Sequence, residues 1–352
     1  MGKIRIGLIG LGNVARRTHL PILKLMDDVL VVAGVERNTF RRERVSKLFG
    51  LNKAYASYEE MYDKESLDAV YVCLPNSLHL DATMKSLERG LHVFCEKPVG
   101  MSSREAMQMT VKSKENNLVF MPGYKYRYCE HFQKGKKLIE SGKLGKILQV
   151  QAQFMTPGPY ISWDAKSDWY VEGKGGGVIY DIGCHTVDLC QFLLSDKIRT
   201  IFAKETKGFK GFSIPTSISC TLSFQSGATG TISFGWRTAV DWVGVQLYGT
   251  AGSVLISKKL FIYENAGTDP YDRIKSNITN AYGEFKSSIK KIIAVGKGKD
   301  VSFEDYQQTR LFVEAIKKKI ELPIEGENAV ETHKVLEAII RSLSNSTEEN
   351  VN

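Results

Sequence analysis

A lysine and a histidine, far apart in the sequence, have the side chains that proton-transfer chemistry requires. Lys97 ends a run of strand-forming apolar residues in the segment LHVFCEKPVG, residues 91–100. Charged side chains are rarely buried without a partner, so Lys97 lies either at a solvated strand end or in a cleft. In GGGVIYDIGCHTVDLCQFLL, Asp181, His185 and Asp188 are spaced i, i+4 and i+7, so they project from one helix face. An imidazole exchanges protons near neutral pH, which makes this helix a candidate for acid-base catalysis.

The same helix has two other interpretations. A single histidine on a helix is more often a partly buried structural residue than a catalyst. Metal binding requires more ligands than this helix supplies, and the sequence contains no HExxH or similar spacing. We therefore expect no metal.

A glycine-rich turn near the N-terminus has the spacing of a dinucleotide-binding site. In IGLIGLGNVA, Gly10, Gly12 and Ala15 form a G-x-G-x-x-A pattern between an expected strand and an expected helix. The glycines allow a tight turn and close approach to a pyrophosphate, which the helix N-terminus then binds. Glu36, at the end of the second expected strand, would accept hydrogen bonds from the ribose 2′-hydroxyl and favours NAD. Arg37 and two neighbouring arginines could instead pair with a 2′-phosphate, so NADP stays open.

Strands and helices alternate over the first third of the chain, which predicts βαβ units and a parallel sheet covered on both faces. The expected strands are residues 4–9, 29–35, 69–74, 91–95 and 118–121, and the expected helices 13–26, 39–49, 77–89 and 102–116. Ser102 and Glu105 fit a capping box that opens the last of these helices. Lys97 would then follow the carboxyl end of a parallel strand, where open α/β sheets bind ligands.

After residue 122 the pattern changes to longer, alternating strands, which predicts a large antiparallel sheet with one packed face. The expected strands are residues 146–156, 198–206, 216–225, 228–236, 243–250 and 253–264, with helices near 177–194, 303–319 and 329–344. We therefore expect a doubly wound dinucleotide-binding domain over 1–122, an α+β domain over 123–345 and a polar tail over 346–352 that frays.

The glycine turn, CLPNSLH at 73–79, EKP at 96–98 and the Asp-x-x-x-His helix occur in that order. Together they resemble the glucose-fructose oxidoreductase and inositol dehydrogenase family, called Gfo/Idh/MocA, over essentially the whole chain. The resemblance implies a Rossmann domain followed by an α/β domain with an open sheet that commonly makes oligomer contacts. It also implies redox chemistry on a carbohydrate or cyclitol hydroxyl.

The resemblance further implies roles for individual residues. It places the catalytic lysine at Lys97 and the substrate-binding and acid-base pair at Asp181 and His185, and it implies a cis bond before Pro98. The residues expected at the cofactor lie in the glycine turn, at the end of the second strand and in two later loops: Gly10, Gly12, Asn13, Val14, Ala15, Glu36, Arg37, Leu74, Pro75, Asn76, His79, Glu96 and Lys97.

Aromatic and basic side chains in the second half are candidates for the substrate site. Tyr126 and Arg127 in GYKYRYC, and Trp163 and Trp169 in the following long loop, could wall a sugar, and Arg127 could bind an anionic group. The other interpretation is that these side chains anchor a domain interface.

Residues 281–300 carry an apolar stripe flanked by lysines. Such a segment could lie on a membrane surface or contact a partner, although a helix that covers its own domain is the commoner outcome. The sequence has no run of about 18 apolar residues, so we expect no transmembrane segment.

Composition narrows the possible binding partners and the cellular compartment of the protein. The 48 basic and 39 acidic residues give a formal charge of +9, but they are spread along the chain without an aromatic-interleaved basic run, so nucleic acid is not expected. The six cysteines include no CxxC pair, which favours a reducing, cytoplasmic compartment.

The leading hypothesis is an NAD(P)-dependent oxidoreductase that transfers hydride between nicotinamide and a secondary hydroxyl or keto group of a sugar, sugar nucleotide or cyclitol, in a homodimer or homotetramer. The alternatives are an NAD-dependent glycoside hydrolase that works by transient oxidation and a non-catalytic, dinucleotide-binding regulator.

Overall fold

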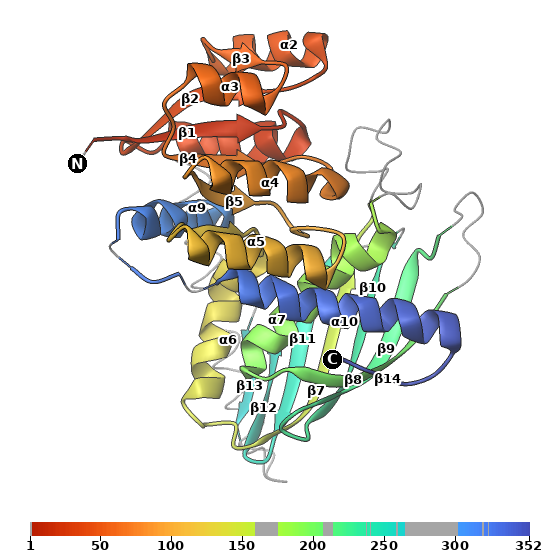
Figure 1. Ribbon diagram of the computed structural model, residues 1–352. Coiled ribbons are helices and arrows are strands. Elements are labelled where there is room, and N and C mark those ends of the chain that lie inside the picture. Colours follow the sequence, from red (N-terminus) through yellow and green to blue (C-terminus); the bar gives the residue numbers. More distant parts are fainter. Residues whose placement is uncertain are drawn as a thin grey trace. The chain divides into compact units, whose positions relative to one another are not determined.

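The computed structural model (Figure 1) describes residues 2–158, 175–206, 214–236, 238–239, 241–257, 260–264, 302–318, 320–322 and 324–352. The chain divides into two compact units. The first unit contains Met1–Lys125 and Val301–Lys334, and the second contains Tyr126–Asp300 and Val335–Asn352. The segment 301–334, which we expected in the second domain, therefore groups with the first unit.

The first unit is built on a six-stranded parallel sheet with the order β3-β2-β1-β4-β5-β6. Its strands are β1 (Ile4–Ile9), β2 (Val29–Val35), β3 (Ala54–Tyr55), β4 (Ala69–Val72), β5 (His92–Cys95) and β6 (Phe120–Pro122). From β1 the chain winds outward to β2 and β3, and from β4 in the opposite direction to β5 and β6. Right-handed crossovers therefore place the helices of the two halves on opposite faces. The carboxyl ends of β1 and β4 meet where the direction reverses, with β5 as the next strand, and such sheets bind ligands at this point.

The helices of the first unit follow the strands in turn: the π-helical turn η1 (Ala15–His19), which continues into α1 (Leu20–Lys24), then α2 (Thr39–Phe49), α3 (Tyr58–Lys64), the 3₁₀ turn η2 (Asn76–Leu78), α4 (His79–Glu88), α5 (Ser103–Glu115) and α9 (Phe303–Ile316). The predicted cap of α5 is confirmed, because Ser102 Oγ accepts a hydrogen bond from Glu105 N at 3.1 Å. The Glu105 carboxylate accepts from Met101 N instead of completing a reciprocal box.

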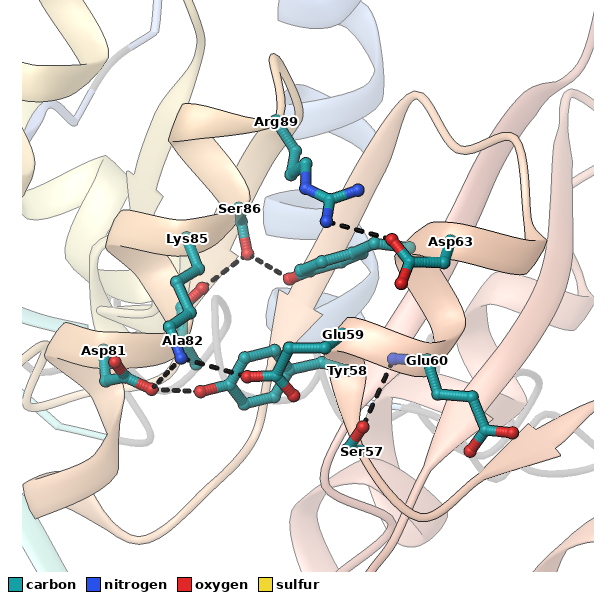
Figure 2. A network of polar contacts seen from close by, with 11 residues as sticks. Ser57, Tyr58, Glu59, Glu60, Asp63, Asp81, Ala82, Lys85, Ser86 and Arg89 are labelled. Carbon is teal, nitrogen blue, oxygen red and sulfur yellow. Dashed lines mark hydrogen bonds and ion pairs between the residues drawn. The ribbon is translucent and has the colours of Figure 1, made fainter.

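Helix α3 and strand β3 are missing from the sequence-based prediction. Only Met61 of α3 is buried, so the helix lacks the broad apolar face that periodicity detects. Polar contacts hold it against α4. Tyr62 Oη lies 2.6 Å from Ser86 Oγ. The Lys85 ammonium lies 3.0 Å from a Glu59 carboxylate oxygen, as Figure 2 shows. Such partly exposed ion pairs contribute about 0–1 kcal/mol each.

An aromatic cluster explains why α9 belongs to the first unit. The rings of Tyr71 on β4 and Phe94 on β5 stack with centroids 4.5 Å apart. Phe312 of α9 meets both rings edge-on at 5.6 and 5.8 Å. All three side chains are fully buried, and burial of a phenyl group stabilises a fold by about 1.5–3 kcal/mol. Helix α9 is thus part of the same core as β4 and β5.

The second unit is built on an eight-stranded sheet with the order β13-β12-β11-β7-β10-β9-β8-β14. Its strands are β7 (Ile147–Met155), β8 (Ile198–Glu205), β9 (Ser217–Phe224), β10 (Thr229–Gly235), β11 (Trp242–Gly249), β12 (Gly252–Ile256), β13 (Leu260–Glu264) and β14 (Glu349–Asn350). All neighbours are antiparallel except β7 and β10, which confirms a mostly antiparallel sheet. The single strand predicted over 253–264 is the antiparallel pair β12 and β13.

Helices cover one face of this sheet. The 3₁₀ turn η3 (Lys125–Tyr128) leads into α6 (Glu130–Glu140), and the π-helical turn η5 (Ile179–Gly183) continues into α7 (Cys184–Leu194). Helix α6 packs on β12 and β13, and α7 on β7 and β10. The opposite face is polar, with exposed glutamines at 149, 151 and 153 on β7, so the alternating pattern in the sequence separates a packed face from an open one.

The C-terminal tail does not fray as predicted. Residues 349–350 form β14, which pairs with the edge strand β8, and Val351 N donates to Arg199 O at 2.9 Å. The Glu349 carboxylate accepts hydrogen bonds from Asn345 and from Arg341 at the end of α10 (Gly326–Asn345). An edge strand presents unpaired backbone groups, and a polar tail can pair with them without an apolar signal in its sequence. Among the described residues, no helix is long and apolar enough to cross a membrane.

Candidate functional site

The glycine turn after β1 has the geometry of a dinucleotide cradle. Gly10 has a φ of 95°, and a Cβ built there would lie 2.5 Å from the Cys73 carbonyl oxygen, so only glycine fits between the loops that follow β1 and β4. A Cβ built at Gly12 would meet no atom within 4 Å, so this side of the turn opens on space that a pyrophosphate can occupy. The residues present therefore fit a bound dinucleotide.

The helix after the turn begins in an unusual way. Residues 15–19 form a π-helical turn in which Ala15 is buried. The helix begins at Asn13, directly after Gly12, and the amides of a helix's first turn are available to an anion. Asn13 Oδ1 accepts a hydrogen bond from Arg16 Nε at 3.1 Å, so these two side chains are engaged with each other beside the turn.

Glu36 lies at the end of β2, as predicted, and its side chain is 10% exposed. One carboxylate oxygen accepts from Asn38 N at 3.0 Å, and the other lies 3.2 Å from Arg41 Nη1. Arg42 is bound to backbone, because its Nη1 donates to the carbonyls of Glu36 and Arg37 at 2.7 and 3.4 Å. Arg37 is exposed. Of the three arginines that left NADP open, Arg41 is the one whose guanidinium pairs with the Glu36 carboxylate.

His79 ties together the loops that follow β4 and β5. Its Nε2 lies 2.7 Å from the carbonyl oxygen of Leu74, and its Nδ1 lies 2.8 Å from that of Pro98. The ring is fully buried, and burial lowers its pKa despite these hydrogen bonds. The structure thus places His79 behind the loop in which Leu74, Pro75 and Asn76 enter η2. The Lys97–Pro98 bond is cis, as the resemblance implied.

Lys97 follows β5 beside a carboxylate held from two sides. Glu96 Oε1 lies 2.7 Å from His19 Nε2, and Glu96 Oε2 accepts from Lys97 N at 3.1 Å. Burial raises the pKa of the Glu96 carboxyl, but the hydrogen bond and charge of His19, with the charges of Lys97 and Lys125, outweigh burial and hold that pKa below its usual value. Within the first unit, Lys97 therefore follows a carboxylate that is held from two sides.

The predicted acid-base helix lies in the second unit, with Asp181 in η5 and His185 in α7. Their exposures are 3% and 6%, so both are buried polar residues that require partners. Asp181 Oδ2 accepts a hydrogen bond from Trp236 Nε1 at 3.0 Å, and the His185 ring meets the Tyr126 ring edge-on with centroids 4.8 Å apart. Trp236 and Tyr126 thus orient the two side chains, and π-helical turns such as η5 are frequent at functional sites.

Arg127 pairs with the carboxylate of Asp188, whereas the sequence suggested that it could bind an anionic group of the substrate. Its Nε and Nη2 donate to the two oxygens of Asp188 at 2.9 and 2.6 Å, and both side chains are buried. Its guanidinium carbon also lies 5.1 Å from the centroid of the Phe192 ring. Burial raises the pKa of the Asp188 carboxyl, although the charge and hydrogen bonds of Arg127 oppose the rise. This geometry favours the structural interpretation for Arg127. Trp163, Trp169 and the segment 281–300 lie outside the described residues.

Comparison with known families decides the classification. Residues 4–124 match the oxidoreductase family with an NAD-binding Rossmann fold, and residues 132–255 match the GFO/IDH/MocA C-terminal domain. The chain belongs to the Gfo/Idh/MocA family. Both the resemblance stated from the sequence and the predicted fold class are thereby confirmed, and the first unit carries the NAD-binding Rossmann fold of these oxidoreductases.

Two relatives of similar sequence cover nearly all and about two thirds of the chain. Myo-inositol 2-dehydrogenase of Thermotoga maritima is 25% identical over 90% of this chain and 96% of its own length. D-xylose 1-dehydrogenase (NADP(+)) 2 of Haloferax volcanii is 28% identical over 66% of this chain and 69% of its own. The WlbA dehydrogenase of Bordetella pertussis, solved with NADH and UDP-GlcNAcA, has the same fold, with a TM-score of 0.84, 20% identity and coverage of 99% and 98%.

Two buried residues that contact the motifs of this Gfo/Idh/MocA protein escaped the sequence analysis. His19 pairs with Glu96 across 77 residues of sequence, and Trp236 with Asp181 across 55. A polar side chain in an apolar run, such as His19 before LPIL, was the available signal, because buried polar groups require partners. The sequence contains no comparable signal for Trp236, since a tryptophan at a strand end fits a core equally well.

We expect the Arg127 and Asp188 pair to be a stability element of the second unit. Asp188→Asn should lower the free energy of unfolding by about 3–5 kcal/mol, because it leaves a buried guanidinium without its counter-charge. Urea unfolding followed by circular dichroism measures this. The double variant Arg127→Met with Asp188→Leu should recover much of the loss, since it removes both buried charges.

Glu130→Gln is the matched control for this pair. Glu130 forms an exposed i, i+4 pair with Lys134 on α6 of the same unit, so its loss should cost less than about 0.5 kcal/mol. A cost for Asp188→Asn as small as that of the control would contradict the structural role.

Proposed function

We propose that this protein is an NAD-dependent dehydrogenase that transfers hydride between nicotinamide and a secondary hydroxyl or keto group of a sugar, sugar nucleotide or cyclitol. That it is an oxidoreductase follows from its family, and the names of its relatives support the substrate class. One observation carries the proposal furthest. The loop that bears Lys97 is hydrogen-bonded through Glu96 to His19, in the helix that follows the glycine turn, so this lysine belongs to the cofactor-binding edge of the sheet.

The side chains divide the chemistry between them in this proposal. NAD, when bound, accepts the hydride from the substrate carbon. Lys97 would donate a hydrogen bond to the reacting oxygen and stabilise the negative charge that develops on it. His185 would take the hydroxyl proton, and Asp181, held by Trp236, would bind a neighbouring hydroxyl. Gly10, Gly12 and Glu36 would hold the dinucleotide.

A substrate panel tests this function. The purified protein is incubated with NAD and with myo-inositol, free sugars, sugar nucleotides and glycosides, and both NADH absorbance and product mass are followed. Accumulation of NADH with an oxidised sugar or cyclitol is the expected result. Cleavage of a glycoside without net NADH would instead indicate transient oxidation, and dinucleotide binding without turnover of any compound would indicate a regulator.

Glu36 should set the preference for NAD. Glu36→Gln removes the carboxylate that repels a 2′-phosphate and leaves Arg41 able to bind it. We expect the ratio of kcat/KM with NADP to that with NAD to rise about tenfold or more, because like charges at short range oppose binding by several kcal/mol. Adding Arg41→Gln to this variant should reverse most of the gain.

Glu43→Gln serves as the comparison for the cofactor preference. Glu43 is exposed on α2, seven residues after Glu36 by subtraction, and removing its charge should leave the NADP to NAD ratio within about twofold. An equal effect of both substitutions would mean that net charge, and not the Glu36 carboxylate, sets the preference.

We further propose that the protein is cytoplasmic and forms a homodimer or homotetramer through the open face of the eight-stranded sheet. All six cysteines are buried thiols, which suits a reducing compartment. Exposed polar side chains, such as Gln151 and Thr231, line that face in register on β7 and β10. A monomeric mass by light scattering would exclude the assembly.

A further inference from the structure

A fully buried histidine pairs with the glutamate that precedes the lysine to which we assign catalysis. His19 ends the π-helical turn η1, and its ring packs against Tyr71 and Phe94 with centroids 5.1 and 5.2 Å away. Its Nε2 lies 2.7 Å from Glu96 Oε1, while its Nδ1 has no hydrogen-bond partner among the described residues. The two aromatic rings hold the imidazole by packing, and the contact with Glu96 orients its polar edge.

Glu96 connects this histidine to Lys97. The second carboxylate oxygen accepts the backbone N–H of Lys97 at 3.1 Å, so the carboxylate is held between the cofactor-binding helix and the first residue of the cis bond. Hydrogen bonds to an ionised group are about twice as strong as neutral ones. A rotation of the Glu96 side chain would therefore disturb both the position and the electrostatic surroundings of Lys97.

Glu96 faces titratable and charged groups from several elements of the first unit. Lys97 lies in its own loop, and the others are His19 of η1, Tyr71 of β4, Cys73 after β4, His79 of α4, Cys95 of β5 and Lys125 after β6. Burial raises the pKa of the tyrosine and of both thiols, so these three groups stay neutral at physiological pH, and burial lowers that of His79. The basic partners of Glu96 are thus His19, Lys97 and Lys125.

We propose that His19 is a positioning residue for Lys97 and that it acts through Glu96. His19 fixes the rotamer of the Glu96 carboxylate, and this carboxylate holds the backbone N–H of Lys97 and places a negative charge beside this residue. The inference rests on the proposed function in one respect, namely that Lys97 acts on the substrate oxygen. The further step is that the helix proposed to bind the dinucleotide also positions the catalytic lysine, through the partly buried hydrogen bond between His19 and Glu96.

The chemistry of the two groups makes the inference specific. Gln can place its amide nitrogen close to where His19 has Nε2, whereas Asn is too short and Phe has no donor. We therefore expect His19→Gln to keep kcat within about threefold, and His19→Phe and His19→Asn to lower it about 10- to 100-fold, as small misplacements of catalytic groups do. The KM for NAD should change little in these variants.

A double-variant cycle separates positioning from packing. If His19 acts through Glu96, then Glu96→Gln and His19→Phe combined should lower kcat no more than either substitution alone. Losses that multiply would overturn the proposal, as would a His19→Phe variant that keeps kcat within twofold. His92→Asn is the matched control, because His92 lies at the other end of β5, where its Nδ1 accepts from Val119 N. If His19→Phe fails to fold, the comparison of kcat between His19→Gln and His19→Asn tests the proposal instead.

A second readout requires no substrate. Trace acetylation with acetic anhydride, quantified by peptide mass spectrometry over a pH series, reports the protonation of Lys97. Loss of the Glu96 charge should lower the pKa of Lys97, so that labelling near pH ~8 rises about tenfold in Glu96→Gln. His19→Phe should also raise the labelling of Lys97. Unchanged labelling in both would refute the coupling, whereas full turnover in Lys97→Met would refute the catalytic assignment and leave the coupling to be judged by labelling.

Discussion

Lys97→Met should lower kcat by at least about 10²–10³-fold while NAD still binds. Lys97 follows the carboxyl end of β5, where its backbone N–H donates to the Glu96 carboxylate, and methionine keeps the length of the side chain while removing the charge and the donors. Since the proposed role is to stabilise charge that develops on the substrate oxygen, the loss should appear in kcat and not in the affinity for NAD. Steady-state kinetics on a substrate from the panel, with calorimetric titration of NAD, measure both.

Lys64→Met is the control for this substitution. Lys64 is 58% exposed and forms an i, i+4 pair with Glu60 on α3 of the same unit, so its replacement should leave kcat unchanged. A Lys97→Met variant with turnover within a few-fold of the wild type would show that the lysine only ends a strand.

His185→Asn should lower kcat by about 10²–10⁴-fold, which is the usual contribution of a positioned general base. The variant should also lose the acidic limb of the pH-rate profile for oxidation. That limb is expected in the wild type because only the unprotonated imidazole can accept the hydroxyl proton, so activity falls as the pH is lowered. Initial rates of NADH formation across the pH range test both expectations.

His131→Asn provides the comparison for His185. His131 lies in α6 of the same unit, where its ring packs against Phe132 with centroids 4.4 Å apart. Its replacement should keep the shape of the pH-rate profile. If His185→Asn retains the acidic limb, another group is the base, and the buried His185 is one of the structural histidines that are common on helices.

The parts of the fold that local patterns determine were predictable. The β1 strand, the glycine turn and the Ser102 cap each depend on residues a few positions apart, and the structure contains all three. The helix with Asp181 and His185 also lies where its periodicity placed it, although its first turn is π-helical. The i, i+4 spacing assumes an α-helix, and a single π-helical turn with its i→i+5 hydrogen bonds is too short to show a different period in the sequence.

The contacts that hold the candidate site together were not predictable, because they join residues distant in sequence. Glu96 meets His19 across 77 positions, and Arg127 meets Asp188 across 61. A single sequence shows that buried polar groups require partners, but many pairings satisfy that requirement. Arg127 illustrates the consequence: an arginine among aromatic residues suggests an anionic substrate, whereas the buried Asp188 carboxylate takes two of its donors.

In the proposed reaction, hydride passes between the nicotinamide and a carbon of the substrate. The most direct test uses NADH carrying two deuterium atoms at C4 with the keto form of a panel substrate, and locates the label in the product by mass spectrometry and NMR. One deuterium is expected on the carbon that bears the new hydroxyl, and none with Lys97→Met over the same period. Product without deuterium, or deuterium lost only to solvent, would contradict the proposed reaction.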